Sequence, residues 1–209
     1  MQKLKFILLL WIALLSIATM KAQDAATYMT PPKDIADLLL AKPTPGVSVD
    51  GKADWMLLSE RNSYPTVEEL GQPEFKIAGI RINPNNFSLS RQNFIKQLSL
   101  KNLVTGKMMS IAGLPNNLSA LNPTWNPSEN KIAFYNVTAT AVDVWVIDIK
   151  TSTCSKINKN AANIVLSSSL IWLDDATVLY KINTHTAAQM SKKPITPKGP
   201  TIQESLGKV

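Results

Sequence analysis

The feature that most constrains the fold is a pattern of turn-forming residues followed by a compact apolar strand, which occurs three times. The three segments are 47–58, 125–135 and 172–180. Trp125 and Trp172 stand 47 residues apart, near the period of about 40–50 residues of one four-stranded β-propeller blade. The pattern therefore predicts an all-β fold of antiparallel propeller blades. An antiparallel sandwich is the alternative, because short strands with regular turns occur in both architectures.

One strand between these tryptophans is especially distinct. Residues 142–149 are apolar on both faces, which predicts an inner strand. The polar stretch 150–153 follows it and is short, as expected of a hairpin turn. In the second segment, Asn130 stands where such hairpins commonly carry glycine, so we expect it to adopt a positive φ.

Two short helices are predicted outside the strand pattern. The first covers residues 35–40, with Asp34 in its first turn, and prolines at positions 43 and 45 stop it. The second begins near Thr66, where Thr66 and Glu69 have capping-box spacing and can satisfy each other's free backbone donors.

The amino-terminal residues 1–22 have the organisation of a secretory signal peptide. Lys3 and Lys5 precede an uncharged run over residues 6–17, and a stretch of small residues ends at Ala22. The run is shorter than the roughly 20 residues that span a bilayer. We therefore expect cleavage before Gln23 and a secreted or periplasmic protein without a stable membrane anchor; an uncleaved anchor is the alternative.

These observations divide the chain into four parts. Residues 1–22 form the signal peptide, and residues 23–46 an extension with the first helix. Residues 47–181 form an incomplete propeller of about two to three blades by repeat length. Residues 182–209, with three prolines and several lysines, are expected to be an extended connector. An open arc of blades leaves bare strand edges, so self-association is expected.

The charge of the chain argues against nucleic acid as a partner. The net charge is +7, and residues 1–22 hold three lysines and no acidic residue, which leaves +7 − 3 = +4. No Arg/Lys cluster alternates with aromatic residues, so nucleic-acid binding is not expected. Cys154 is the single cysteine, which excludes an intramolecular disulfide. Asn86, Asn117 and Asn136 match the glycosylation pattern.

The sequence predicts no catalytic, cofactor-binding or metal-ligating residue. The single histidine, His185, lies among threonines at the start of the connector, and no serine stands in a Gly-x-Ser-x-Gly setting. One histidine and one cysteine cannot supply a zinc site, and no glycine-rich phosphate loop occurs, so no cofactor is expected. The adjacent carboxylates Asp174 and Asp175 fall in a predicted hairpin turn, where turn formation explains them.

Four of the tryptophans recur within strand segments. They are Trp55, Trp125, Trp145 and Trp172. Because tryptophan buries a large area, packing between blades is favoured over a stacking site for sugars or bases.

Several runs of the sequence are long and unusual, and they lie within residues 31–38, 43–50, 55–58, 64–70, 72–84 and 197–204. Together these runs resemble the amino-terminal part of glutamyl endopeptidase-like members of the prolyl oligopeptidase family. The resemblance implies a secreted serine peptidase in which an amino-terminal propeller caps a carboxy-terminal α/β-hydrolase domain and limits access to peptide-sized substrates.

The sequence departs from this family because it ends at Val209 without a counterpart of the catalytic serine, aspartate and histidine. We therefore expect a non-catalytic propeller portion of a peptidase, whose peptide substrates are engaged through the hydrolase domain of a longer parent. The chain would then be a fragment of a longer reading frame or a degenerate product. A free-standing exported module that binds other proteins is the alternative.

Overall fold

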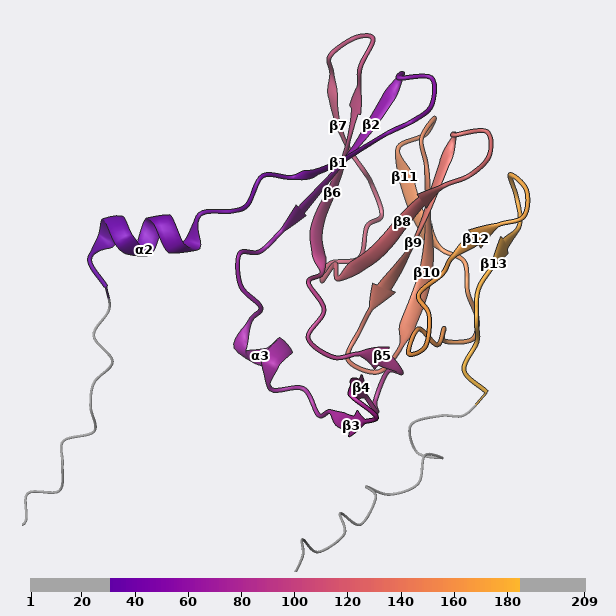
Figure 1. The fold of residues 1–209 in the computed structure, drawn as a ribbon. Coiled ribbons are helices and arrows are strands. Elements are labelled where there is room, and N and C mark those ends of the chain that lie inside the picture. Colours follow the sequence, from indigo (N-terminus) through magenta and orange to yellow (C-terminus); the bar gives the residue numbers. More distant parts are fainter. Residues whose placement is uncertain (1–30, 185–209) are drawn as a thin grey trace, which may run out of the picture. The chain divides into compact units, whose positions relative to one another are not determined.

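The structure is a computed structural model that describes residues 31–184 (Figure 1). The chain divides into two compact units between Ala41 and Lys42. The first unit contains α2 (Lys33–Leu40), which begins directly after Pro32 and carries Asp34 in its first turn. This confirms the first predicted helix. Residues 1–30, with the predicted signal peptide, and residues 185–209 lie outside the described residues.

The second unit is built mainly of antiparallel strands. Its largest sheet follows the order β1-β2-β6-β8-β9-β10-β11, with β7 paired to β6. Its strands are β1 (Gly46–Val49), β2 (Trp55–Arg61), β6 (Ile95–Asn102), β7 (Met108–Ser110), β8 (Ala120–Trp125), β9 (Lys131–Val137), β10 (Val142–Asp148) and β11 (Thr153–Lys156). No sheet of the described residues is closed. The prediction of an all-β fold is confirmed.

The large sheet consists of two four-stranded groups. β6 and β8 pair only through Ile95 and Ala120, whereas pairing within each group is extensive. We call β1, β2, β6 and β7 the first group and β8 to β11 the second group. A separate hairpin, β12 (Ile171–Trp172) and β13 (Val178–Leu179), follows them. Figure 1 shows the first group, the second group and this hairpin side by side in that order.

A smaller region is inserted between β2 and β6. It contains α3 (Val67–Leu70) and a three-stranded sheet of β3 (Phe75–Ile77), β4 (Ile80–Asn83) and β5 (Ser88–Leu89). Both hydrogen bonds of the predicted capping box form, since Thr66 Oγ1 accepts from the Glu69 backbone and Glu69 accepts from the Thr66 backbone. The second predicted helix is confirmed.

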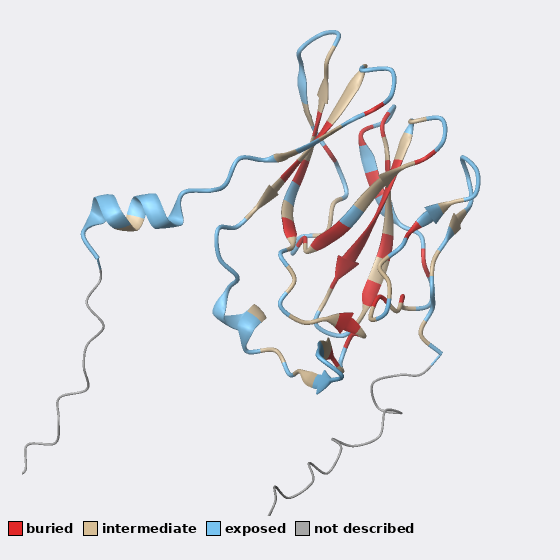
Figure 2. Cartoon of the chain, viewed as in Figure 1, coloured by how far each residue is buried: buried red, intermediate tan, exposed pale blue. Residues whose placement is uncertain are grey.

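Two hydrophobic clusters form the core, and β10 contributes to both. Ile147 belongs to the first cluster, whereas Val142 and Val144 belong to the second. Successive side chains of a strand point to opposite faces, so a strand that is apolar on both faces must lie between two packed layers. β10 pairs with β9 on one side and β11 on the other, which confirms the predicted inner strand. Figure 2 shows the buried residues concentrated along the second group.

The prediction of a positive φ at Asn130 is wrong. The residue with a positive φ in this turn is Glu129, one position earlier. Glu129 has a φ of 59°. The side chain of Asn126 accepts hydrogen bonds from the backbone N–H groups of Asn130 and Lys131. These bonds hold the residues after the turn, so the left-handed conformation falls at position 129.

Candidate functional site

Each of the three turn-and-strand segments forms a hairpin, and one Asp or Asn side chain organises each turn. This side chain accepts two backbone N–H groups that follow it, at 2.7 to 3.1 Å. The organising residues are Asp50 between β1 and β2, Asn126 between β8 and β9, and Asp174 between β12 and β13. The turn role predicted for Asp174 is confirmed, and hydrogen bonds led by that from the Ala176 backbone lower the pKa of its carboxyl group.

Carboxylates join each turn to the one before it. Glu129 Oε1 in the second turn accepts from the backbone N–H of Gly51 in the first, at 2.6 Å. Asp175 Oδ1 in the third turn accepts from the backbone N–H of Ser128 in the second, at 2.8 Å. The donating N–H shifts by one residue, from Gly51 to Ser128, because the second turn has Pro127 at the place of Gly51, and proline has no N–H.

Asp175 makes further contacts with the second turn. Its carboxylate also accepts from Ser128 Oγ and, at 2.9 Å, from Asn126 Nδ2. The hydrogen bond from the Ser128 side chain is the main cause that lowers the pKa of Asp175. Asp175 therefore serves as a link between hairpins.

Tryptophans join the same hairpins at their strands. Trp125 Nε1 donates to Ser48 Oγ at 2.9 Å, and Trp172 Nε1 donates to the Thr124 carbonyl oxygen at 3.0 Å. Ser48 and Thr124 each stand two residues before the organising residue of their turn. The third hairpin therefore reaches the second at the same acceptor position at which the second reaches the first, although Trp125 stands one residue and Trp172 two residues before the organising residue of its own turn. We call these three hairpins the stacked hairpins.

The tryptophans predicted to pack do contact the core. Trp55, Trp125 and Trp145 pack against the first cluster, and Trp172 packs against the second. Trp145 Nε1 is buried and has no hydrogen-bond partner among the described residues.

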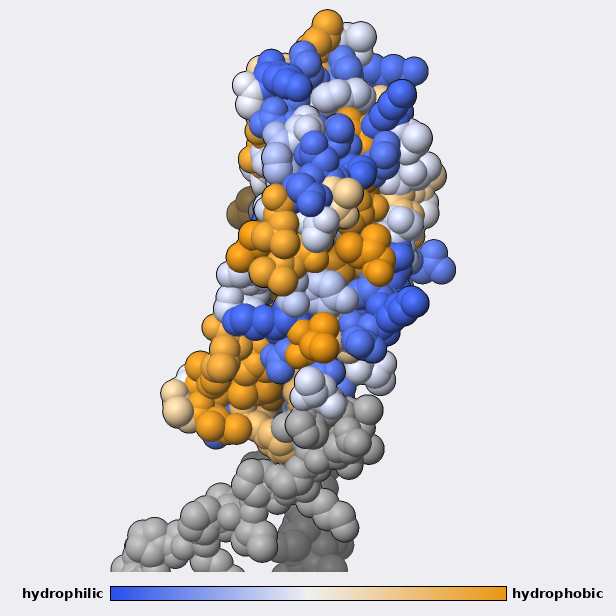
Figure 3. Space-filling view, turned by 90° about the vertical axis from the view of Figure 1, so that its right-hand side faces the viewer, coloured by the Kyte–Doolittle hydropathy of each residue, from blue (hydrophilic) through white to orange (hydrophobic). Residues whose placement is uncertain are grey.

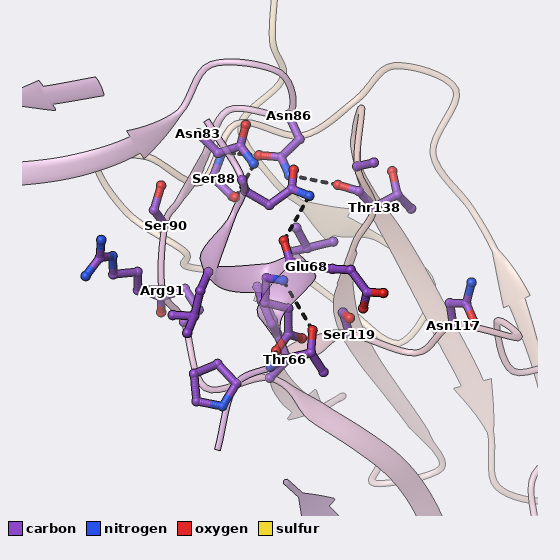
Figure 4. A pocket seen from close by; sticks show the side chains of 18 of the residues that line it. Thr66, Glu68, Asn83, Asn86, Ser88, Ser90, Arg91, Asn117, Ser119 and Thr138 are labelled. Carbon is purple, nitrogen blue, oxygen red and sulfur yellow. Dashed lines mark hydrogen bonds between the residues drawn. The ribbon is translucent and has the colours of Figure 1, made fainter. Parts of the chain in front are cut away.

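A pocket of about 660 Å³ lies between the inserted region and the second group. α3, the residues around β5 and the loops at 116–119 and 137–139 line it. Figure 4 shows hydroxyl, amide and charged side chains around this pocket, with Asn86 directed toward Thr138. Asn86 Nδ2 donates to the Thr138 carbonyl oxygen at 2.7 Å, which joins the inserted region to the end of β9.

Two serines that line the pocket, Ser88 and Ser119, are not arranged as nucleophiles. Ser88 is buried, and its hydroxyl donates to the side-chain oxygen of Asn86 at 2.7 Å. Lys96 Nζ donates to Ser119 Oγ at 2.9 Å and also forms an ion pair with Glu69. A nucleophilic serine requires a base that accepts its proton. These contacts therefore activate neither hydroxyl.

Other residues singled out in the sequence are also placed. His185 lies outside the described residues. Cys154 is buried, and this burial raises the pKa of its thiol to about 12, so the thiolate that would react or bind metal is disfavoured. Across residues 31–184, no group of three or more His, Cys, Asp or Glu side chains could hold a metal ion. Within the same range, no helix is long and apolar enough to cross a membrane.

Burial separates the three asparagines of the glycosylation pattern. Asn86 and Asn136 are buried, and both side chains are engaged in hydrogen bonds to the protein. A glycan requires an accessible amide, so these two cannot be acceptors in the folded protein. Asn117 is exposed. The sequence pattern could not distinguish them because burial depends on contacts with distant segments.

Comparison with known proteins gives two relatives and no matching family model. The chain is 29% identical over 185 residues to a protein of Arabidopsis thaliana named "Probable glutamyl endopeptidase, chloroplastic", which covers 83% of this chain. It is 26% identical over 191 residues, or 85% of this chain, to a protein of Oryza sativa subsp. japonica with the same name. The chain spans about a fifth of the length of these relatives. The similarity supports a peptidase-related origin.

Proposed function

We propose that this chain is the non-catalytic propeller portion of an exported serine peptidase of the prolyl oligopeptidase family, in its glutamyl endopeptidase-like branch. In this role the strand groups limit the access of peptides to a hydrolase domain, and that domain performs the hydrolysis. The observation that carries the proposal is that each of the later stacked hairpins reaches the hairpin before it through one indole and one carboxylate. The similarity to proteins named glutamyl endopeptidase supports it.

The recurring contacts favour blades over a two-sheet sandwich. A propeller repeats one four-stranded sheet around an axis, so each blade meets the next through equivalent residues. A sandwich packs two sheets face to face, and its two inner faces need not repeat any contact. Here the Trp125 and Trp172 indoles donate at equivalent positions of the preceding hairpin. The first and second groups would then be two blades, with β12 and β13 beginning a third.

The proposal that this chain is not catalytic rests on the hydrogen-bond partners of two serines in the pocket. In the pocket, Ser88 is bonded to an amide and Ser119 accepts from a lysine, so neither has a base beside it. Removal of a member of a serine triad lowers the rate by about 10⁴-fold or more. Because no base activates Ser88 or Ser119, we expect the chain to show no peptide hydrolysis.

A peptidase assay tests this proposal. We expect the purified chain to give no turnover of fluorogenic peptides containing glutamate or proline, under conditions in which an added serine peptidase cleaves them. The His185→Ala variant and the matched Thr186→Ala variant are assayed in parallel. Turnover that persists through purification and disappears only in His185→Ala would show that the chain is itself a peptidase.

A further inference from the structure

The stacked hairpins end in two apolar faces that no other part of the described unit covers. The first is the side of β12–β13 directed away from the second group, which we call the downstream face. Trp172 pairs with Val178, and both pack against the second core cluster. The neighbouring pair, Ile171 and Leu179, points to the opposite side and is 50% and 53% exposed. Figure 3 shows hydrophobic residues gathered on this side of the molecule.

Leu173 extends the downstream face. It is 62% exposed, and its backbone N–H donates to the Thr177 carbonyl oxygen at 3.0 Å, which continues the pairing of β12 with β13 one residue past Trp172. Alternation along this pairing places Leu173 on the same side as Ile171. The hairpin is thus apolar on both faces, as β10 is, but only one of its faces is packed.

The second apolar face lies at the other end of the stacked hairpins, on β1. Ser48 is directed toward the second group, because its hydroxyl accepts from Trp125. Val47 and Val49 therefore point the opposite way, and they are 57% and 43% exposed. We call this side the upstream face. The residues paired with these valines, Leu58 and Met56, extend it onto β2.

The two faces correspond to the two halves of the contact that recurs inside the molecule. Within the chain, each later hairpin packs one of its sides against the hairpin before it, as Trp125 does against β1 and Trp172 against β8. We propose that the upstream face of one copy of this protein binds the downstream face of a second copy, head to tail. Both halves of this interface belong to the chain, so a second copy supplies everything that the contact needs.

This contact between copies differs from the internal contacts in one respect. Val49 stands at the place of Trp125, and Ala53 at the place of Glu129, when the turns are aligned on Asp50 and Asn126. The upstream face therefore has neither an indole donor nor a linking carboxylate. Association between copies rests on apolar burial, so it should not weaken as NaCl is raised. Such a contact is heterologous and gives open chains or rings.

Sedimentation velocity of the full chain over a range of concentrations tests the proposal. We expect concentration-dependent association. Leu173→Asp on the downstream face and Val47→Asp on the upstream face should each weaken it by at least about 30-fold, because a charge would be buried in an apolar contact. Val104→Asp is the matched control, since Val104 is 75% exposed in the turn after β6 and belongs to neither face.

A mixture of the two variants makes the test specific for a head-to-tail contact. Leu173→Asp retains its upstream face, and Val47→Asp retains its downstream face. Equal amounts of the two should therefore form a 1:1 complex that cannot grow further, although each is monomeric alone. Circular dichroism of each variant checks that it is folded.

Three results would overturn the proposal. The first is a chain that is monomeric at all concentrations, which would leave the two faces to another partner. The second is association that survives both face variants, for example through residues 6–17, which all variants retain. The third is a mixture that stays monomeric. This proposal does not rest on the proposed function, because the outcome of the peptidase assay does not affect the oligomeric state.

Discussion

Single side chains decide how the hairpins of this protein are joined. Trp125 and Trp172 combine apolar packing with a directed N–H donor. Trp145 contributes packing alone, and it lies directly opposite Phe134, which is fully buried in the first cluster. Burial of the apolar surface of such an indole stabilises the fold, whereas burial of its unpaired N–H donor destabilises it.

Replacement of Trp145 separates these two effects. Trp145→Ala should lower the free energy of unfolding by about 3–5 kcal/mol through lost packing. Trp145→Phe should lower it by less than half of that amount, because it keeps an aromatic ring and removes the unpaired N–H. Urea denaturation followed by circular dichroism measures both, with Val104→Ala as the exposed control. Equal losses for the two variants, or a loss below about 1 kcal/mol for Trp145→Ala, would contradict the packing role.

At the scale of the elements, the β12–β13 hairpin depends on contacts with another element. Its two strands have two residues each, and a two-stranded hairpin alone is marginally stable in water. Trp172 and Asp175 attach it to the second group at its strand and at its turn. The attachment at the turn depends on the charge of a carboxylate and is therefore sensitive to pH.

Lowering the pH should weaken this attachment. The hydrogen bond from Ser128 lowers the pKa of Asp175 in the folded state below its ordinary value of 3.8. The stabilisation is therefore complete above pH 3.8 and is lost as the pH falls through the folded-state value. Ser128→Ala should reduce the difference between the unfolding free energies at pH 6 and pH 3, whereas Ser155→Ala, on exposed β11, should not.

This comparison of variants removes the contribution of other carboxyl groups. The pKa of Glu74 is also lowered, because contacts with Arg81 and Arg91 outweigh the effect of its desolvation. Glu74 titrates equally in the wild type and in both variants. A pH dependence that is unchanged in Ser128→Ala would show that the link between Asp175 and the second turn contributes nothing to stability.

At the scale of the whole molecule, the proposed role requires export. We expect the protein expressed in a secreting bacterium to begin at Gln23, which intact-mass measurement of the exported material checks. Lys3→Glu together with Lys5→Glu should reduce export, because a signal peptide needs a positively charged start. Recovery of the full 22.9 kDa chain in the membrane fraction would instead indicate an uncleaved anchor.

The sequence by itself determined the features that depend on local pattern. The all-β class, the three turn-and-strand segments, the inner strand predicted over residues 142–149 and the capping box at Thr66 follow from alternation, turn residues and spacing within about ten residues. The structure confirms each of them. These features are encoded locally because they are set by the direction of successive side chains and by hydrogen bonds between near neighbours.

Only the tertiary structure decided which distant residues meet. The burial of Asn86 and Asn136 and the links from Trp172 and Asp175 to the second group involve partners that are far away in sequence. The inserted region and its pocket likewise join α3 to loops about 50 to 70 residues later. A local pattern cannot specify such contacts, because the same alternation fits several arrangements of strands. The packing of whole groups against one another selects among them.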